Sequence, residues 1–310
     1  MIRTVTRPDE FRSALVLTGP TGSGKSALAL ELAEKLGAEI VAMDSMTLYR
    51  GMDVGTAKPG VEDRRRVPHH LIDVLDPWET GSVAWWLERA RDCVRDIESR
   101  GRRALVVGGT PLYLKALLSG LFEGPPADAE VRARLTAEAD AVGVEALHAK
   151  LAAVDASTAD RLHPNDLRRV VRALEVWELT RRPISAWQTQ WAPNAKPQAA
   201  RVFCLDRPRD ELYARINQRV LDLLKAGWLD EVRGLRTLPR PLSREARLAL
   251  GYRELNDFLD TKRGWDETVA LIQQRTRNYA KRQLTWFRHL SEVRFVTPEL
   301  TTMAWTGRMI

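Results

Sequence analysis

The sequence GPTGSGKS, residues 19–26, has the residue types and spacing of a phosphate-binding loop. Its glycines allow the backbone to turn N–H groups toward an anion, and a helix that begins there adds partial positive charge. We expect Lys25 to contact the outer phosphates and the hydroxyl of Ser26 to bind a magnesium ion. The pattern predicts a site for a pyrophosphate-bearing ligand, formed by Gly19, Pro20, Thr21, Gly22, Ser23, Gly24, Lys25 and Ser26. The alternative is a glycine-rich turn that binds nothing.

The elements around this loop are those that a phosphate-binding loop requires. The apolar run at residues 14–17 predicts a buried strand before it. Leu28, Leu32 and Leu36 recur at helical spacing after it, and Gly37 is placed to end that helix. Strand, loop and helix therefore stand in the order that brings the helix N-terminus to the ligand.

Two further strands are predicted along the first part of the chain. AEIVAMD ends on Asp44, and RRALVVGG is followed by a helix with Thr110 as its expected N-cap. Alternating strands and helices indicate a parallel α/β sheet flanked by helices, with a P-loop NTPase-like fold. Because the carboxyl ends of parallel strands meet at one edge, we expect Asp44, Thr110 and residues 19–26 to converge.

The two polar residues at these strand ends each allow two interpretations. Asp44 could bind magnesium or act as a general base, or it could cap a turn with Ser45. Thr110 could bind an anion at a helix N-terminus, or it could be an ordinary N-cap. The strand before Thr110 ends in glycines instead of the acid that ATP-hydrolysing proteins commonly place there, which weakens an ATPase interpretation.

The pattern changes at residues 122–128. From there to about residue 197 the periodicity is helical, so we predict a helical insertion at 125–196 within a core formed by 1–124 and 197–310. Asn165 and Asp166 are expected to cap a helix whose first turns carry Arg168, Arg169 and Arg172. These arginines could face a partner anion or could belong to a solvated face with Glu175 and Glu178. ARVFCLD, residues 200–206, returns to strand, and the remainder is mostly helical.

Basic residues gather without acidic ones in RTRNYAKRQLTWFRH. On a helix, Arg277, Lys281 and Arg288 form a ridge opposite the apolar face, as expected for contact with a nucleic-acid backbone. In another predicted helix, Arg215 and Arg219 are one turn apart. Either could reach the phosphate site, although periodicity alone places both on the surface.

Composition limits the partners and the compartment. The chain of 310 residues has 48 Lys and Arg against 41 Asp and Glu, a net charge of +7 that favours an anionic partner. The two cysteines, Cys93 and Cys204, lie in apolar surroundings, so neither a disulfide framework nor structural zinc is expected. His69 and His70 are interpreted as loop packing. With no apolar signal core and no membrane-spanning window, the expectation is a soluble cytoplasmic protein.

Together, segments along most of the chain resemble the tRNA dimethylallyltransferase family, also called tRNA isopentenyltransferases. They run in order from about residue 15 to about residue 290: GPTGSGKS, DSMTLYRGMDVGTAKP, PHHLIDVLDP, VVGGTPLYLKALLSGL, RLHPNDLRRVVRALEV, GYRE and TRNYAKRQLTWFR. The resemblance implies transfer of a dimethylallyl group from dimethylallyl diphosphate to N6 of the adenosine at tRNA position 37, beside the anticodon, in tRNAs that read codons starting with U. It also implies a Mg²⁺ requirement, a helical insertion around the tRNA anticodon stem-loop, and a monomer without an obligate protein partner.

The resemblance carries roles to particular residues. It places the donor diphosphate on residues 19–26, with Lys25 and Ser26 on phosphate and metal. Asp44 resembles the base that contacts adenine N6, while Thr110 and Arg219 resemble the groups that hold the leaving pyrophosphate. The regions that match the tRNA-contacting parts of the family are Asp44, Ser45, Met46, Thr47, Thr110, Arg132, Arg168, Arg169, Val170, Val171, Arg172, Arg247, Gly251, Tyr252, Arg275, Arg277, Lys281 and Arg282.

Two positions depart from the family pattern. Many members have Gln where this chain has Thr47, so a side-chain role of that Gln does not carry over. Ser26 replaces a common Thr but keeps the metal-binding hydroxyl. The alternatives to the transferase are a P-loop kinase of a nucleoside or small metabolite, an adenylate prenyltransferase, and an RNA-binding module that uses nucleotide only as a structural ligand.

Overall fold

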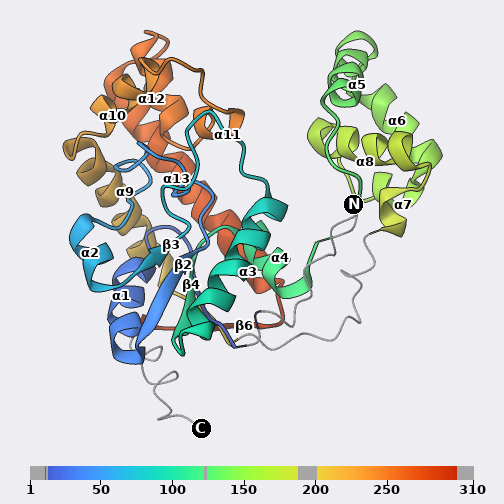
Figure 1. The fold of residues 1–310 in the computed structure, drawn as a ribbon. Coiled ribbons are helices and arrows are strands. Elements are labelled where there is room, and N and C mark those ends of the chain that lie inside the picture. The colour runs from blue at the N-terminus through green and yellow to red at the C-terminus, as the bar shows by residue number, and fades with distance from the viewer. Residues whose placement is uncertain (1–10, 12, 122–123, 188–200, 299–310) are drawn as a thin grey trace. The chain divides into compact units, whose positions relative to one another are not determined.

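The computed structural model describes residues 11, 13–121, 124–187 and 201–298. Within them the chain forms one parallel sheet with the strand order β3-β2-β4-β1-β5-β6 (Figure 1). The strands are β1 (Leu15–Thr18), β2 (Ala38–Ala42), β3 (His69–His70), β4 (Arg103–Gly108), β5 (Arg201–Leu205) and β6 (Val293–Val296). The prediction of a P-loop NTPase-like α/β sheet is confirmed.

The first helices cover both faces of this sheet. α1 (Lys25–Leu36) connects β1 to β2, and α3 (Val83–Ser99) connects β3 to β4 in the opposite direction along the sheet. Since such crossovers are right-handed, α1 and α3 lie on opposite faces. The α4 helix (Pro111–Ser119) lies beside α3, where the rings of Trp86 and Tyr113 stack with centroids 4.4 Å apart.

Local sequence explains where these helices begin and end. The Ser82 hydroxyl accepts a hydrogen bond from the backbone N–H of Trp85 at 3.1 Å and so caps α3. Gly37, with φ 60°, ends α1 in the left-handed conformation that glycine adopts without strain. The end of α1 at Gly37 was predicted from the sequence.

Between β5 and β6 the chain is helical. This part contains α9 (Arg209–Lys225), α10 (Trp228–Arg236), α11 (Arg244–Arg247), α12 (Tyr252–Leu259) and α13 (Trp265–Arg288); a short α2 (Val61–Arg66) precedes β3. The α9 and α13 helices pack through Leu212, Ile216 and Ala280, all of which are buried. None of the described helices has an apolar stretch long enough to cross a membrane.

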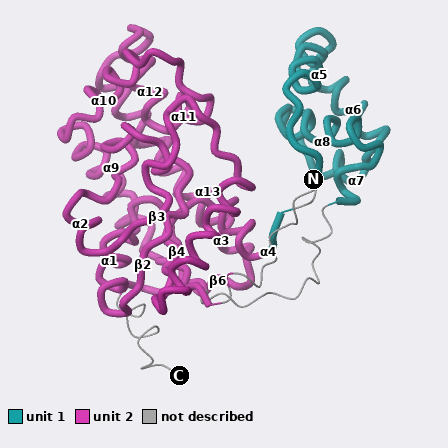
Figure 2. Tube along the Cα trace, viewed as in Figure 1, with its two compact units in different colours: residues 1–5, 119–196 teal, residues 6–118, 197–310 magenta. Residues whose placement is uncertain are grey.

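The described chain divides into two compact units (Figure 2). Residues 13–118 and 201–298 belong to the larger unit, which contains the sheet, and residues 119–121 and 124–187 belong to the smaller one. The smaller unit consists of α5 (Ala129–Val142), α6 (Val144–Val154), α7 (Ala156–Ala159), α8 (Leu167–Thr180) and the 3₁₀ helix Ile184–Ala186. Its helices share a core that includes Leu135, Leu147, Leu151 and Leu174.

Two strands were not predicted. His69 and His70, interpreted from the sequence as loop packing, form β3 and pair with Ile40 and Val41 of β2. β6 extends the sheet beyond β5, in the remainder of the chain that was predicted to be mostly helical. The N-terminal residues 1–10 and the segment WAPNAKPQ, residues 191–198, were interpreted from the sequence but lie outside the described residues.

Candidate active site

A cleft of about 790 Å³ lies in the larger unit at the carboxyl ends of the strands. Thr21, Lys25 and Ser26 of the phosphate-binding loop line it, together with Asp44 after β2 and Arg219 of α9. Its remaining lining includes apolar side chains of α9 and aromatic side chains of α10, α12 and α13: Ile216, Val220, Leu223, Trp228, Tyr252 and Tyr279. The cleft thus joins a charged end to an apolar wall.

Arginines support the phosphate-binding loop from α9 and the residues just before it. Arg207 donates through Nε to the carbonyl of Ser23 at 2.7 Å, and Arg215 donates through Nε to the carbonyl of Gly22 at 3.0 Å. Both arginines therefore bind the backbone of the loop. Arg219, one turn after Arg215, instead lines the cleft. The structure thus gives Arg215 and Arg219 different surroundings, which helical periodicity alone could not distinguish.

Lys25 and Arg219 repel one another in a desolvated environment. Burial, and then the Arg219 guanidinium, lower the pKa of Lys25 to about 8, and the Asp44 carboxylate opposes this shift. Burial also lowers the pKa of Arg219, again opposed by Asp44. Two cations thus share one carboxylate, which favours an anionic ligand in the cleft.

Asp44 is held by its own turn. Its Oδ1 accepts hydrogen bonds from the backbone N–H of Met46 at 2.8 Å and of Thr47 at 3.4 Å. The turn-capping interpretation is therefore correct for one carboxylate oxygen. Since Asp44 also lines the cleft, capping and a chemical role are compatible.

Thr110 connects two of the strand ends. Its hydroxyl accepts a hydrogen bond from the backbone N–H of Ser45 at 3.1 Å, which links the start of α4 to the residue after Asp44. The β2 and β4 backbones are also very close here: a Cβ atom on Gly108 would lie 2.0 Å from the carbonyl oxygen of Met43. As predicted, the residues that follow β2 and β4 converge.

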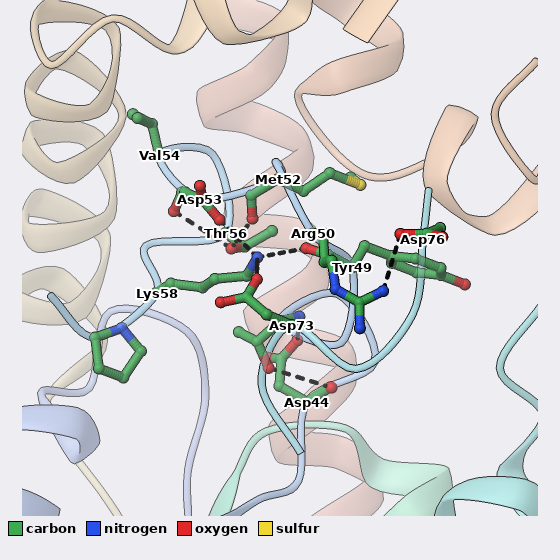
Figure 3. A network of polar contacts seen from close by, with 12 residues as sticks. Asp44, Tyr49, Arg50, Met52, Asp53, Val54, Thr56, Lys58, Asp73 and Asp76 are labelled. Atoms are coloured by element: carbon green, nitrogen blue, oxygen red, sulfur yellow. Dashed lines mark hydrogen bonds and ion pairs between the residues drawn. The ribbon is translucent and has the colours of Figure 1, made fainter. Parts of the chain in front are cut away.

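Lys58 cross-links the loops beside Asp44 (Figure 3). Its ammonium is buried and donates to Asp53 at 2.6 Å, to Asp73 at 2.5 Å and to the backbone carbonyl of Tyr49. Asp73 has φ 56°, an unfavourable backbone conformation that these contacts help to hold. Sequence reasoning did not identify Lys58; the buried ammonium becomes evident only when its partners are known.

Glu231 of α10 holds the next part of this loop. It accepts hydrogen bonds from the backbone N–H groups of Asp53, Val54 and Gly55 at 2.6–3.1 Å and from the Tyr252 hydroxyl at 2.6 Å. Gly251, expected from the resemblance to contact tRNA, packs so closely on Trp228 that a Cβ atom would lie 2.0 Å from its ring. Tyr252 and Trp228 line the cleft, and Glu231 is a second functional candidate that the sequence did not reveal.

The basic helix α13 is only partly a free surface. Arg275 forms an ion pair with buried Glu254, and Arg277 donates to the side-chain oxygen of Asn217 at 2.5 Å. Lys281 and Arg282 are exposed, and neither forms an ion pair among the described residues. The exposed cations without an ion pair thus lie in the C-terminal half of this helix, where Arg282 also lies over the Tyr279 ring with its Cζ 5.8 Å from the centroid.

The smaller unit uses much of its basic charge internally. Glu175 is fully buried and pairs with Arg132 at 2.9 Å and Arg172 at 2.6 Å. Arg168 and Arg169 are both exposed, and Arg169 lies 3.3 Å from Asp166. Arg172 thus pairs with Glu175 of its own helix, but because Glu175 is buried, the two do not form the solvated face that was the alternative expectation.

Val170 and Val171 require a correction. Their side chains are 1% and 6% exposed and belong to the core of the smaller unit, so they offer no side-chain surface to tRNA. Among the expected contacts in the larger unit, Arg247 is exposed, whereas Thr47 is 8% exposed. Ser45 and Met46 line the cleft.

The Ser26 hydroxyl suits a magnesium ion whose other ligands would be mainly phosphate oxygens and water. Ser26 lines the cleft, and its hydroxyl makes no hydrogen bond to a described residue. The described residues contain no cluster of three or more His, Cys, Asp or Glu suited to a metal. Mg²⁺ is commonly bound by one or two protein oxygens, substrate phosphates and water, so a single hydroxyl beside a diphosphate is an appropriate contribution.

Fold and cleft together define a P-loop NTPase-like α/β protein. The IPP transferase family model matches residues 47–290, and the isopentenyl transferase model matches residues 13–70. The chain belongs to the tRNA dimethylallyltransferase family.

Individual relatives agree over nearly the whole chain. The tRNA dimethylallyltransferase of Geobacter metallireducens is 47% identical over 94% of each chain, and that of Symbiobacterium thermophilum is 51% identical over 88% of this chain and 86% of the relative. A crystal structure of the tRNA isopentenylpyrophosphate transferase from Bacillus halodurans matches with a TM-score of 0.68 and 37% identity, covering 96% of this chain and 95% of that one. A eukaryotic dimethylallyltransferase acting on tRNA matches with a TM-score of 0.76 and 25% identity, covering 94% of this chain and 75% of that one.

The lowered pKa of Lys25 predicts a pH dependence of ligand affinity. A diphosphate monoester should bind tightly below pH about 8, where Lys25 is an ammonium, and lose up to about tenfold in affinity per pH unit above it. Titration calorimetry with an alkyl diphosphate tests this, because such a ligand is fully ionised above neutral pH. Lys25→Arg, which keeps its charge, should remove the dependence; equal affinity of the wild-type protein at pH about 7 and about 9.5 would contradict it.

Proposed function

We propose that this protein transfers the dimethylallyl group of dimethylallyl diphosphate to N6 of the adenosine that follows the tRNA anticodon, position 37, in tRNAs that read codons starting with U. The observation that carries the proposal is the shared cleft of the phosphate-binding loop and Asp44, in a chain that belongs to this enzyme family. The apolar wall of the cleft suits a prenyl chain. The proposed setting is the cytoplasm, with the protein acting as a monomer.

Departure of the diphosphate is the step that the cationic end of the cleft supports. Lys25 and Arg219 would neutralise the charge that develops on the leaving pyrophosphate, and the loop N–H groups add hydrogen bonds. The Thr110 hydroxyl, which accepts a hydrogen bond from the N–H of Ser45 beside Asp44, would position a phosphate oxygen. A Mg²⁺ ion bound to Ser26 and the phosphates would supply further charge neutralisation.

Attack by adenine requires positioning and removal of a proton. The N6 amine is a weak nucleophile because its lone pair is delocalised into the ring, and the base must leave its stack to reach the cleft. One oxygen of Asp44 is engaged by the N–H groups of Met46 and Thr47, which orients the carboxylate. Its other oxygen would accept the proton as the new carbon–nitrogen bond forms.

The alternative functions are not favoured. A P-loop kinase and an adenylate prenyltransferase both act on small acceptors, which need neither the exposed cations of α13 nor the helical unit. The glycines that end β4 supply no acid to activate water, in keeping with transfer to an amine. Family membership, with identities of 43–51% over most of the chain, agrees with the transferase.

Incubation with unmodified tRNA, Mg²⁺ and labelled dimethylallyl diphosphate tests the function. We expect label on tRNA at the adenosine beside the anticodon, located by nuclease digestion and mass spectrometry, and no ATP consumption. Label on free adenosine nucleotides would indicate the adenylate prenyltransferase. ATP consumption without labelled tRNA would instead indicate a kinase.

Asp44→Asn tests the proposed base. Asparagine keeps an oxygen that can accept from Met46 and Thr47, so the turn should remain, but it cannot accept a proton from adenine. We expect kcat to fall by about 10²–10⁴-fold while the tRNA Kd stays within about threefold. Asp92→Asn, on exposed α3 surface, is the matched control; a near-normal kcat for Asp44→Asn would refute the assignment.

The exposed cations of α13 should contact the tRNA backbone. Lys281→Ala combined with Arg282→Ala should weaken tRNA binding and lower the slope of log Kd against log salt by about 1–2. The control pair Lys35→Ala and Arg65→Ala removes the same charge from exposed positions on α1 and α2. Equal salt slopes for both double variants, measured by filter binding, would argue against this surface.

A further inference from the structure

Gln283 of α13 joins the phosphate-binding loop to the end of β4. Its side-chain oxygen accepts a hydrogen bond from the backbone N–H of Thr21 at 2.9 Å, and its Nε2 donates to the carbonyl of Gly109 at 2.6 Å. The side chain is 2% exposed and lines the cleft. One amide therefore spans the two backbone segments between which the diphosphate is expected to bind.

The two contacts fix the orientation of the amide. The Thr21 N–H can only donate and the Gly109 carbonyl can only accept, so the bridge needs an acceptor and a donor on one side chain. Space is also restricted, since a Cβ atom on Gly109 would lie 2.6 Å from Nε2 of Gln283. Few side chains other than glutamine meet both requirements at this length.

The segments that Gln283 joins carry the proposed chemistry. Thr21 belongs to the loop that contains Lys25, and Gly109 immediately precedes Thr110, whose hydroxyl binds the N–H of Ser45 beside Asp44. Three hydrogen bonds, joined through the covalent backbone of Gly109 and Thr110, therefore link the phosphate-binding loop to the Asp44 turn. Tyr279, one turn before Gln283 on the same helix, also lines the cleft.

We propose that Gln283 is a positioning residue for prenyl transfer, which sets the distance between the phosphate-binding loop and the Thr110–Asp44 side of the cleft. It does so without touching either substrate's reacting atoms. This inference rests on the proposed function, because it concerns the alignment of the diphosphate with the base. Loss of the bridge would let the phosphate-binding loop and the end of β4 move apart. Misalignment of the reacting groups would then lower the reaction rate.

Gln283→Met preserves the length of the side chain and removes both hydrogen bonds. With the labelled-donor assay, we expect kcat/KM for dimethylallyl diphosphate to fall by roughly 10- to 100-fold, while the tRNA Kd stays within about twofold. Gln274→Met, at an exposed position of the same helix, is the matched control and should behave as wild type. Wild-type kinetics for Gln283→Met would overturn the inference.

Gln283→Glu gives a readout that a purely structural role would not change. When ionised, the introduced carboxylate accepts from Thr21 but cannot donate to Gly109, whereas the protonated acid can do both. The ratio of variant to wild-type kcat/KM should therefore rise as pH falls from about 8.5 to about 6, and burial of the carboxyl helps to keep it protonated. If this kcat/KM ratio does not change with pH, the inference is overturned. The Gln283→Glu test therefore remains decisive even if the Gln283→Met variant does not fold.

The two proposals fail in distinguishable ways. Absence of label on tRNA with the wild-type protein would refute the transferase function itself. Normal transfer by the wild type, together with unaltered kinetics and a flat pH ratio for the Gln283 variants, would refute only the positioning role.

Discussion

Electrostatic repulsion between Lys25 and Arg219 at the phosphate-binding end of the cleft is the constraint on which the site depends. Lys25 and Arg219 are desolvated next to one another, and Asp44 is the carboxylate that offsets them. The folded state contains this repulsion because the sheet and α9 bring Lys25 and Arg219 close together. Arg207 and Arg215 fix the backbone of the phosphate-binding loop, and Lys58 and Glu231 fix the segments beside Asp44. These contacts keep Lys25 and Arg219 in place, and a bound anion would reduce the repulsion between them.

The loop that follows Asp44 is fixed by side chains that bind its backbone groups. Lys58 and Glu231 engage the loop after Asp44 through its carbonyl and N–H groups, and Thr110 binds the N–H of Ser45. Contacts of this kind fix a loop that has no regular structure of its own. The result is an Asp44 carboxylate with a defined orientation, as the proposed proton transfer would require.

Local pattern was sufficient for the elements and for part of the site. β1, α1 and the convergence of Asp44 with Thr110 follow from periodicity, caps and the geometry of parallel strands. β3 was missed because two polar histidines show no strand pattern. Gln283 was missed because its partner Thr21 is 262 positions away in the sequence, and no local pattern around Gln283 indicates that contact. The ion pairs of Arg132 and Arg172 with Glu175 were equally invisible, since periodicity gives the face of a helix but not what packs against it.

The contact between Gly108 and Met43 has a consequence for the evolution of this fold. Hydrolytic P-loop proteins activate water with an acid at the end of a strand. Here any side chain at Gly108 would collide with the β2 backbone, and one at Gly109 would displace the Gln283 amide. A carboxylate at either position would therefore require the Met43 backbone or the Gln283 amide to move. The close approach of the residues that follow β2 to the end of β4 thus disfavours an acid at the place where hydrolytic P-loop proteins carry one.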